Sequence, residues 1–443
     1  MKNPKFEIMV NLDWNNLPFG YIKTDFNVRC HYKNGQWGKP EVSDSEYINI
    51  HIAATGLHYG QEAFEGMKAY RGRDGKVRLF RWDENAKRLI SSANGIHMAP
   101  VPIELFREAV FTAVRLNEKF VPPYGSGASL YVRPVLYGSG AEVGVKPASE
   151  YTFIVFVTPV GPYFKGGVKP VNMLICRDVD RAAPLGTGNI KVGGNYAASL
   201  RAIVKAREGG YGNALFLDAL EKKYLDECGP ANFFGIKNNT YVTPKSVSIL
   251  PSITNKSLIA IAESMGIKTE RRRIPVEELA EFEETGACGT AAVISPIAKI
   301  FDPETGKVYE YCKDGKPGPV SMKLFNKLVG IQYGDEPDEF GIYGPNAGLC
   351  ETGVERRRRD FRNVNGGFRN RFFRPYGFSG GHAKDQRTDI SRTGIGPYFF
   401  VQRYRHIFLL GVVDGDDNAY DSGIRGHGEY GGKQHSSSDD NGR

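Results

Sequence analysis

One lysine of this sequence has surroundings that could support amine chemistry. Lys191 lies in the segment GTGNIKVGGNY (residues 186–196), among four glycines and directly before a predicted helix. The segment lacks the GK[ST] of a phosphate-binding loop and the third glycine of a dinucleotide fingerprint. A lysine that is desolvated beside another cationic group can attack an aldehyde as a free amine. The spacing alone is equally that of a solvated lysine in a loop.

Two further segments carry groups that could complete such a site. The stretch LDECGPANFF (residues 225–234) has an acid, Glu227, at a strand end, where it could project into a cleft. A plain turn leading into the strand 232–236 is the other interpretation. The segment ILPSIT (residues 249–254) enters a helix, whose first backbone N–H groups could bind a phosphate. Many helices begin in this way without binding any ligand.

The elements that must position these groups alternate between strands and helices. We expect strands at 27–32 and 41–52, and a helix with Asp83 as its N-cap. Two prolines and three glycines mark residues 160–170 as a linker. We therefore predict a small N-terminal domain over 1–160, an interdomain linker over 161–170 and a larger domain over 171–343.

Composition excludes several classes of protein. The chain has 443 residues, 41% of them hydrophobic, and no run approaches the ~20 apolar residues of a membrane span. The N-terminus has no apolar core of a signal peptide. The six cysteines form no CxxC pair and the eight histidines no HxxxH pattern, so no metal site is expected. We expect a cytoplasmic protein with reduced thiols.

The last hundred residues differ from the rest. Residues 344–443 hold 16 Lys and Arg against 12 Asp and Glu, and residues 1–343 hold 42 against 38, so each part carries +4 of the total +8. Arginine dominates lysine and glycine is enriched in this tail. We expect it to be mostly disordered, with local order at 398–413. A frame-shifted or readthrough terminus is the preferred explanation, and a genuine appended segment is the alternative.

Several segments together resemble the fold-type IV pyridoxal-phosphate enzymes, and more closely the branched-chain amino acid aminotransferases. Lys191, Glu227 and the turn at 253–254 occur in that order in the class. The longer matches are HYGQEAFEGMK (58–68), YVRP (131–134), TPVGPYF (158–164), KVGGNY (191–196), GTAA (289–292) and IQYG (331–334). The resemblance covers residues 5–343. It implies an α/β (α+β) fold with a smaller N-terminal α/β domain and a larger, barrel-like C-terminal α/β domain.

The resemblance also implies roles for individual residues toward pyridoxal 5'-phosphate. Lys191 would form the Schiff base and move a proton between the substrate's α-carbon and the cofactor's C4′. Glu227 would face the pyridine nitrogen and keep it protonated. Tyr196 would donate to the phenolic oxygen. The phosphate would be held by Arg81, the backbone of Ile253 and Thr254, and the Thr290 hydroxyl.

On the substrate side the resemblance implies an aromatic pocket for Val, Leu and Ile side chains. Its expected walls are Tyr59, Phe64, Tyr131 and Tyr163, for which packing in the core is the alternative. Arg133 would bind the distal carboxylate of glutamate, and Thr290 and Ala291 would offer backbone donors to the α-carboxylate. Val143 and Val145 match positions that approach the partner subunit's site, so a homodimer is expected.

The expected function is the reversible, ping-pong transamination of L-leucine, L-isoleucine and L-valine with 2-oxoglutarate. A D-amino acid transaminase or an aminodeoxychorismate lyase of the same fold is an alternative, against which the YVRP and GTAA segments argue. RNA binding through the tail is an alternative of another class. The tail has arginine with interleaved aromatic residues, but its acids dilute the charge, and we expect no nucleic-acid partner.

Overall fold

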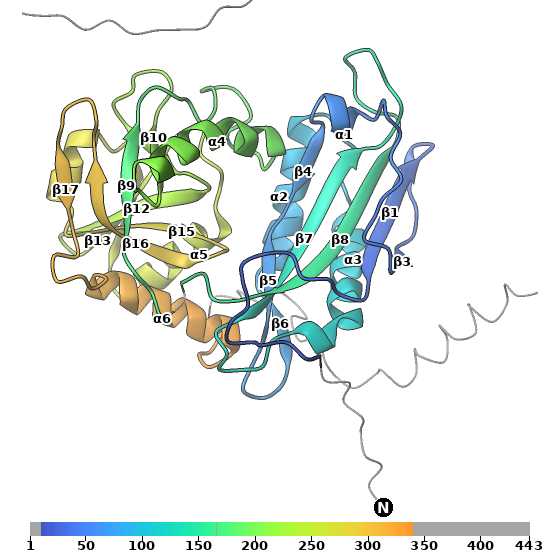
Figure 1. Cartoon of the computed structure of the whole chain (residues 1–443), viewed down its shortest axis with the longest axis horizontal. Coiled ribbons are helices and arrows are strands. Elements are labelled where there is room, and N and C mark those ends of the chain that lie inside the picture. The colour runs from blue at the N-terminus through green and yellow to red at the C-terminus, as the bar shows by residue number, and fades with distance from the viewer. Residues whose placement is uncertain (1–9, 165, 340–443) are drawn as a thin grey trace, which may run out of the picture. The chain divides into compact units, whose positions relative to one another are not determined.

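The computed structural model describes residues 10–164 and 166–339 of the chain. The described residues form two β-sheets, each with its own helices, shown in blue to teal and in green to orange (Figure 1). Among these residues no helix is long and apolar enough to cross a membrane. The predicted tail at 344–443, with its expected local order at 398–413, lies outside the described residues.

The first sheet is antiparallel and has the order β2-β1-β8-β7-β5-β6, with β3 paired to β1 and β4 paired to β7. Helices α2 and α3 pack against each other, and α3 packs on β1, β7 and β8 (Figure 1). The elements are β1 (Asn27–Lys33), β2 (Gln36–Trp37), β3 (Glu41–Ser43), α1 (Thr55–His58), β4 (Glu62–Phe64), β5 (Met67–Arg71), β6 (Val77–Leu79), α2 (Trp82–Gly95), α3 (Ile103–Leu116), the 3-10 helix Glu118–Phe120, β7 (Ser129–Gly138) and β8 (Tyr151–Val160).

Strand β7 separates the two faces of this sheet. Leu130, Val132 and Leu136 are fully buried in the main hydrophobic core beneath α2 and α3. The alternate residues Tyr131 and Arg133 are only partly buried and lie on the opposite face. One face of the sheet is therefore core, while the other carries polar and aromatic side chains.

The second sheet curls into a barrel. Its order is β11-β10-β9-β16-β15-β12, and β11 also pairs with β12, which closes the ring. Strands β13 and β14 extend from β12, and β17 pairs with β16. The elements are β9 (Val171–Cys176), α4 (Gly193–Glu208), β10 (Asn213–Leu217), β11 (Leu225–Cys228), β12 (Ala231–Lys237), β13 (Thr240–Pro244), α5 (Ile253–Ser264), β14 (Lys268–Arg272), the 3-10 helix Val276–Glu281, β15 (Glu284–Gly289), β16 (Val293–Phe301), β17 (Val308–Glu310) and α6 (Pro319–Tyr333).

The predicted mixed α/β fold with a barrel-like second half is confirmed. The two sheets divide the described chain between Val160 and Val171, where the linker was predicted. That the parts 1–160 and 171–343 are separate domains stays a prediction.

Two local predictions are wrong. The strand expected at 41–52 ends at Ser43, because the next residues bond to side chains instead of to a neighbouring strand. The Asn27 and Arg29 side chains both donate to the Ser45 carbonyl. Asp83 is not the N-cap of α2, since Arg81 holds that position with a left-handed backbone of φ 49° and starts the helix earlier. Asp83 instead lies in the first turn, where a negative charge favours the helix.

Candidate active site

The backbone around Lys191 is held on both sides. Its N–H donates to the Ser92 hydroxyl over 2.9 Å, and its carbonyl accepts from the Phe64 N–H over 3.1 Å. The Asn195 amide donates to the carbonyls of Thr187 and Ile190. The loop before α4 is therefore pinned to the first sheet and to α2, which fixes where the lysine side chain begins.

The Lys191 ammonium nitrogen lies between two aromatic rings. It donates to the Tyr196 hydroxyl over 2.6 Å and lies 4.7 Å from the centre of the Phe64 ring. Burial, followed by the nearby Arg88 guanidinium, lowers the pKa of Lys191 to about 7. A substantial fraction of this side chain is therefore an uncharged, nucleophilic amine at neutral pH.

Glu227 is a buried carboxylate in the barrel. Strand β11 carries it, and it accepts from the Asn232 side chain at 2.7 Å and from the Leu250 N–H at 3.1 Å. The Arg181 guanidinium lies 3.0 Å from its second oxygen. Burial raises the pKa of Glu227 to about 7, although Arg181 acts in the opposite direction. Such a group can share a proton with a buried basic nitrogen.

The residues predicted to hold a phosphate are donors with unused capacity. Arg81 is 8% exposed, and its Nη1 atom is buried without a hydrogen-bond partner among the described residues. Ile253 and Thr254 form the first turn of α5, where backbone N–H groups have no acceptor within the helix. The Thr290 hydroxyl donates to the Gly66 carbonyl over 3.3 Å. Phe80, which precedes Arg81, packs in one hydrophobic cluster with Ile253.

Three of the predicted substrate residues lie together on the open face of the first sheet. The Arg133 guanidinium stacks 4.9 Å from the Phe64 ring centre and donates to the Tyr131 hydroxyl over 3.1 Å. The Nε atom of Arg133 is buried and has no partner in the described part of the chain. Tyr163 joins this group indirectly, because Phe19 packs edge-on against both Tyr131 and Tyr163.

The remaining predicted residues lie apart from this cluster. Tyr59 is 43% exposed, and its hydroxyl donates to the Val143 carbonyl. Val143 and Val145 are 80% and 89% exposed. These two valines lie in the loop after β7, and the bond from Tyr59 ties that side chain to the same exposed loop.

Comparison with known proteins identifies the family. The class IV amino-transferase family matches residues 62–300. The branched-chain-amino-acid aminotransferase of Haemophilus influenzae is 48% identical over 334 residues, which cover 74% of this chain and 96% of that protein. The chain belongs to the branched-chain aminotransferase family of class IV aminotransferases.

Solved structures of this aminotransferase family agree with the fold. The branched-chain amino acid aminotransferase of Escherichia coli has a TM-score of 0.60 at 27% identity, covering 72% of this chain and 98% of its own. The T.th. enzyme complexed with N-(5'-phosphopyridoxyl)-L-glutamate has a TM-score of 0.60 at 26% identity, with the same coverage. Fold-type IV is therefore the fold of this chain.

Sequence reasoning missed the ion pairs that surround the lysine of this aminotransferase. Arg88, on α2, makes two bonds of 2.8 and 2.7 Å to the fully buried Glu65 and a third to the Pro251 carbonyl. Arg181 pairs with Glu227 as described above. Glu65 lies within the matched segment 58–68, and that position was the only signal available for it.

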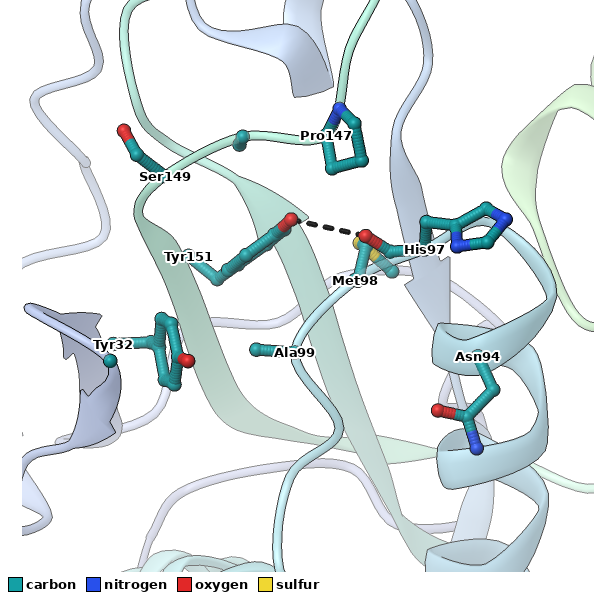
Figure 2. Close-up of a pocket in the computed structure, with 10 residues that line it drawn as sticks. Tyr32, Asn94, His97, Met98, Ala99, Pro147, Ser149 and Tyr151 are labelled. Atoms are coloured by element: carbon teal, nitrogen blue, oxygen red, sulfur yellow. Dashed lines mark hydrogen bonds between the residues drawn. The ribbon is translucent and has the colours of Figure 1, made fainter.

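A cavity of about 540 Å³ lies elsewhere on the aminotransferase, beside the end of α2 (Figure 2). Its lining includes Tyr32, Asn94 and Ser149. The Tyr151 hydroxyl donates to the His97 carbonyl over 3.2 Å, drawn as the dashed line in Figure 2. None of the predicted site residues lines it, so it is separate from the Lys191 cluster.

Proposed function

We propose that this chain catalyses the reversible transamination of L-leucine, L-isoleucine and L-valine with 2-oxoglutarate, using pyridoxal 5'-phosphate in a ping-pong mechanism. The products are the branched-chain 2-oxo acids and L-glutamate. The observation that carries the proposal is the partly neutral Lys191 amine, 2.6 Å from Tyr196, in a chain with relatives named for this activity.

The chemistry of the donor set fits pyridoxal phosphate. When bound, the cofactor supplies an aldehyde that condenses with amines and a ring that withdraws electrons from the substrate's α-carbon. Arg81, with its unpartnered buried Nη1, would hold the phosphate together with the N–H groups of Ile253 and Thr254 and the Thr290 hydroxyl. Glu227 would hold a proton at the pyridine nitrogen.

Lys191 has two roles in this proposal. Its amine first binds the aldehyde carbon, and after a substrate amine displaces it, the same amine moves a proton between the substrate's α-carbon and C4′ of the cofactor. A pKa near 7 suits both roles, because the amine must be able to give and to accept a proton at neutral pH. Tyr196 orients the amine and donates to the cofactor's phenolic oxygen.

The open face of the first sheet would hold the substrate. Phe64, Tyr131 and Tyr163 offer flat walls to a branched side chain, whose burial contributes ~0.8 kcal/mol per CH₂ group. Arg133 would bind the distal carboxylate of glutamate, for which its buried, unpartnered Nε atom is available. Backbone donors at Thr290 and Ala291 would bind the α-carboxylate.

A homodimer would use the residues that lie apart from the cluster. Tyr59, Val143 and Val145 would face the partner's site across the interface, together with other exposed apolar residues such as Ile52, which is 88% exposed. A second copy of the chain is the occupant that we propose for this surface, and sedimentation would show whether Val145→Asp releases monomers. We also propose a cytoplasmic location, which suits the free cysteines of the described residues.

Absorbance spectroscopy and steady-state assays test the proposal. The purified protein should absorb near the visible edge and lose that band on addition of L-leucine, and Lys191→Ala should be colourless and inactive. Faster turnover of D-alanine than of L-leucine would contradict the substrate assignment and favour a D-amino acid transaminase. Release of pyruvate from aminodeoxychorismate would favour the lyase. RNA binding that is lost on truncation after Tyr343 would support the alternative function of the tail.

A further inference from the structure

Lys68 is a buried lysine on the same sheet face as the candidate site. It is 7% exposed and lies on β5, directly opposite Tyr131 of β7. Residues opposite each other on paired strands project to the same face of the sheet. Lys68 therefore shares the open face with Tyr131 and Arg133.

The Lys68 ammonium lacks a counter-charge. It donates to the Ala291 carbonyl over 2.8 Å, and no carboxylate of residues 10–164 or 166–339 forms an ion pair with it. Arg88 and Arg181, the other buried cations near the site, have Glu65 and Glu227 as partners. Burying an unpaired charge is costly, so an anion that arrives from outside would be stabilised here.

The bond to Ala291 brings this charge to the turn between β15 and β16. On the same turn, the Thr290 hydroxyl donates to the carbonyl of Gly66, two residues before Lys68. Two successive residues of the turn are thus held by one short segment of the first sheet. One carbonyl satisfies one of the three ammonium donors and leaves two for a ligand.

Burial lowers the pKa of Lys68 to about 8, so the group is mostly cationic at neutral pH. A bound carboxylate raises the pKa of a neighbouring ammonium, which favours the charged form further. The group is therefore suited to anion binding, and it is distinct from the Lys191 amine, which is a nucleophile.

We propose that Lys68 supplies the counter-charge for the α-carboxylate of amino-acid and oxo-acid substrates at the turn of residues 289–292. This inference rests on the proposed function, because it assumes that substrates present their α-carboxylate to that turn. Backbone N–H groups alone offer dipoles, whereas Lys68 adds a full positive charge that selects acids over their amides.

The test compares a carboxylate with its neutral amide on the cofactor-loaded enzyme. Binding of 4-methylpentanoate and of 4-methylpentanamide would be measured by calorimetry for the parent, Lys68→Met, Lys68→Arg and the exposed-site control Lys76→Met. We expect Lys68→Met to weaken acid binding on the order of tenfold and to leave amide binding unchanged. Lys68→Arg should restore most of the acid binding, and Lys76→Met should match the parent.

Three outcomes would overturn the proposal. Equal weakening of acid and amide in Lys68→Met, with a lower visible-edge absorbance, would show that Lys68 only supports the turn. Unchanged binding of both probes would show that it has no role. A parent that neither absorbs near the visible edge nor turns over L-leucine would refute the proposed function itself, and this inference with it.

Discussion

The terminal nitrogen of Lys191 lies 2.6 Å from the hydroxyl oxygen of Tyr196, which is in the first turn of the helix that follows. The hydroxyl keeps the amine beside the Phe64 ring and away from solvent. Because burial and Arg88 both disfavour the ammonium form, the amine is poised to react at neutral pH.

The rate at which cofactor-free enzyme takes up pyridoxal phosphate should rise with pH through about 7. Only the unprotonated amine reacts, and the lowered pKa of Lys191 makes that form abundant above about pH 7. Below that value the rate should fall about tenfold per pH unit. Stopped-flow absorbance between pH 5.5 and 8.5 would measure it, and a midpoint near 10 would contradict the role of burial.

Glu227→Gln should change how stability depends on pH. Burial raises the folded-state pKa of Glu227 to about 7, from an ordinary value of 4.5. Between these values the folded state binds more protons than the unfolded state, so this group makes the parent less stable as pH rises. The variant lacks that loss, and its free energy of unfolding should gain on the parent by up to about 1.4 kcal/mol per pH unit.

Urea unfolding of the two cofactor-free proteins at pH 5 and pH 7 would measure this difference. The variant leaves Arg181 without its partner, so its absolute stability is lower at both values, and only the change in the difference matters. A constant difference between the proteins would show that Glu227 is ionised throughout this range.

Arg133→Met should separate the two classes of oxo acid. A hydrogen bond to a charged group contributes about 1.5–3 kcal/mol, so kcat/KM for 2-oxoglutarate should fall about 10- to 150-fold. The value for 4-methyl-2-oxopentanoate, which has no distal carboxylate, should change by less than about threefold. Arg133→Lys is the matched control and should retain part of the 2-oxoglutarate activity. Equal losses for both acids would assign Arg133 to packing on Phe64.

Glu65→Ala should destabilise the protein by about 3–5 kcal/mol, because it leaves the Arg88 guanidinium buried and unpaired. The double variant Glu65→Met with Arg88→Met should lose less than the single variant. Asp25→Ala is the control, since its ion pair with Lys119 is partly exposed and contributes at most about 1 kcal/mol. Urea unfolding would compare them, and similar losses in Glu65→Ala and Asp25→Ala would contradict the prediction.

The long strands were predictable from sequence, whereas the closure of the barrel was not. Residues 129–136 and 151–159 carry β-branched and aromatic runs, and both segments lie in β7 and β8. The pairing of β11 with β12 and the parallel pairing of β9 with β16 join segments whose local patterns carry no mark of their partners. The strand expected beyond Ser43 failed because side chains there compete for backbone carbonyls.

For the site, residues with unusual neighbours were easier to find than residues with unusual partners. The glycines around Lys191 are visible in the sequence. A buried cation such as Arg88 has the same letter as a surface cation, and its partner Glu65 is 23 residues away. Lys68 contacts Ala291 across 223 residues of chain. Tyr59 belongs to a matched motif, yet within one chain its hydroxyl bonds to the exposed Val143 loop.

The bonds from Phe64 to Lys191, from Lys68 to Ala291 and from Arg88 to Pro251 join the first sheet to the barrel half of the chain. None of them can form until both sheets have folded and docked. Acquisition of colour by a refolding sample should therefore lag behind its circular dichroism signal. The cofactor would report the last step of assembly, so a colourless preparation with a normal far-ultraviolet spectrum would indicate sheets that have formed but not docked.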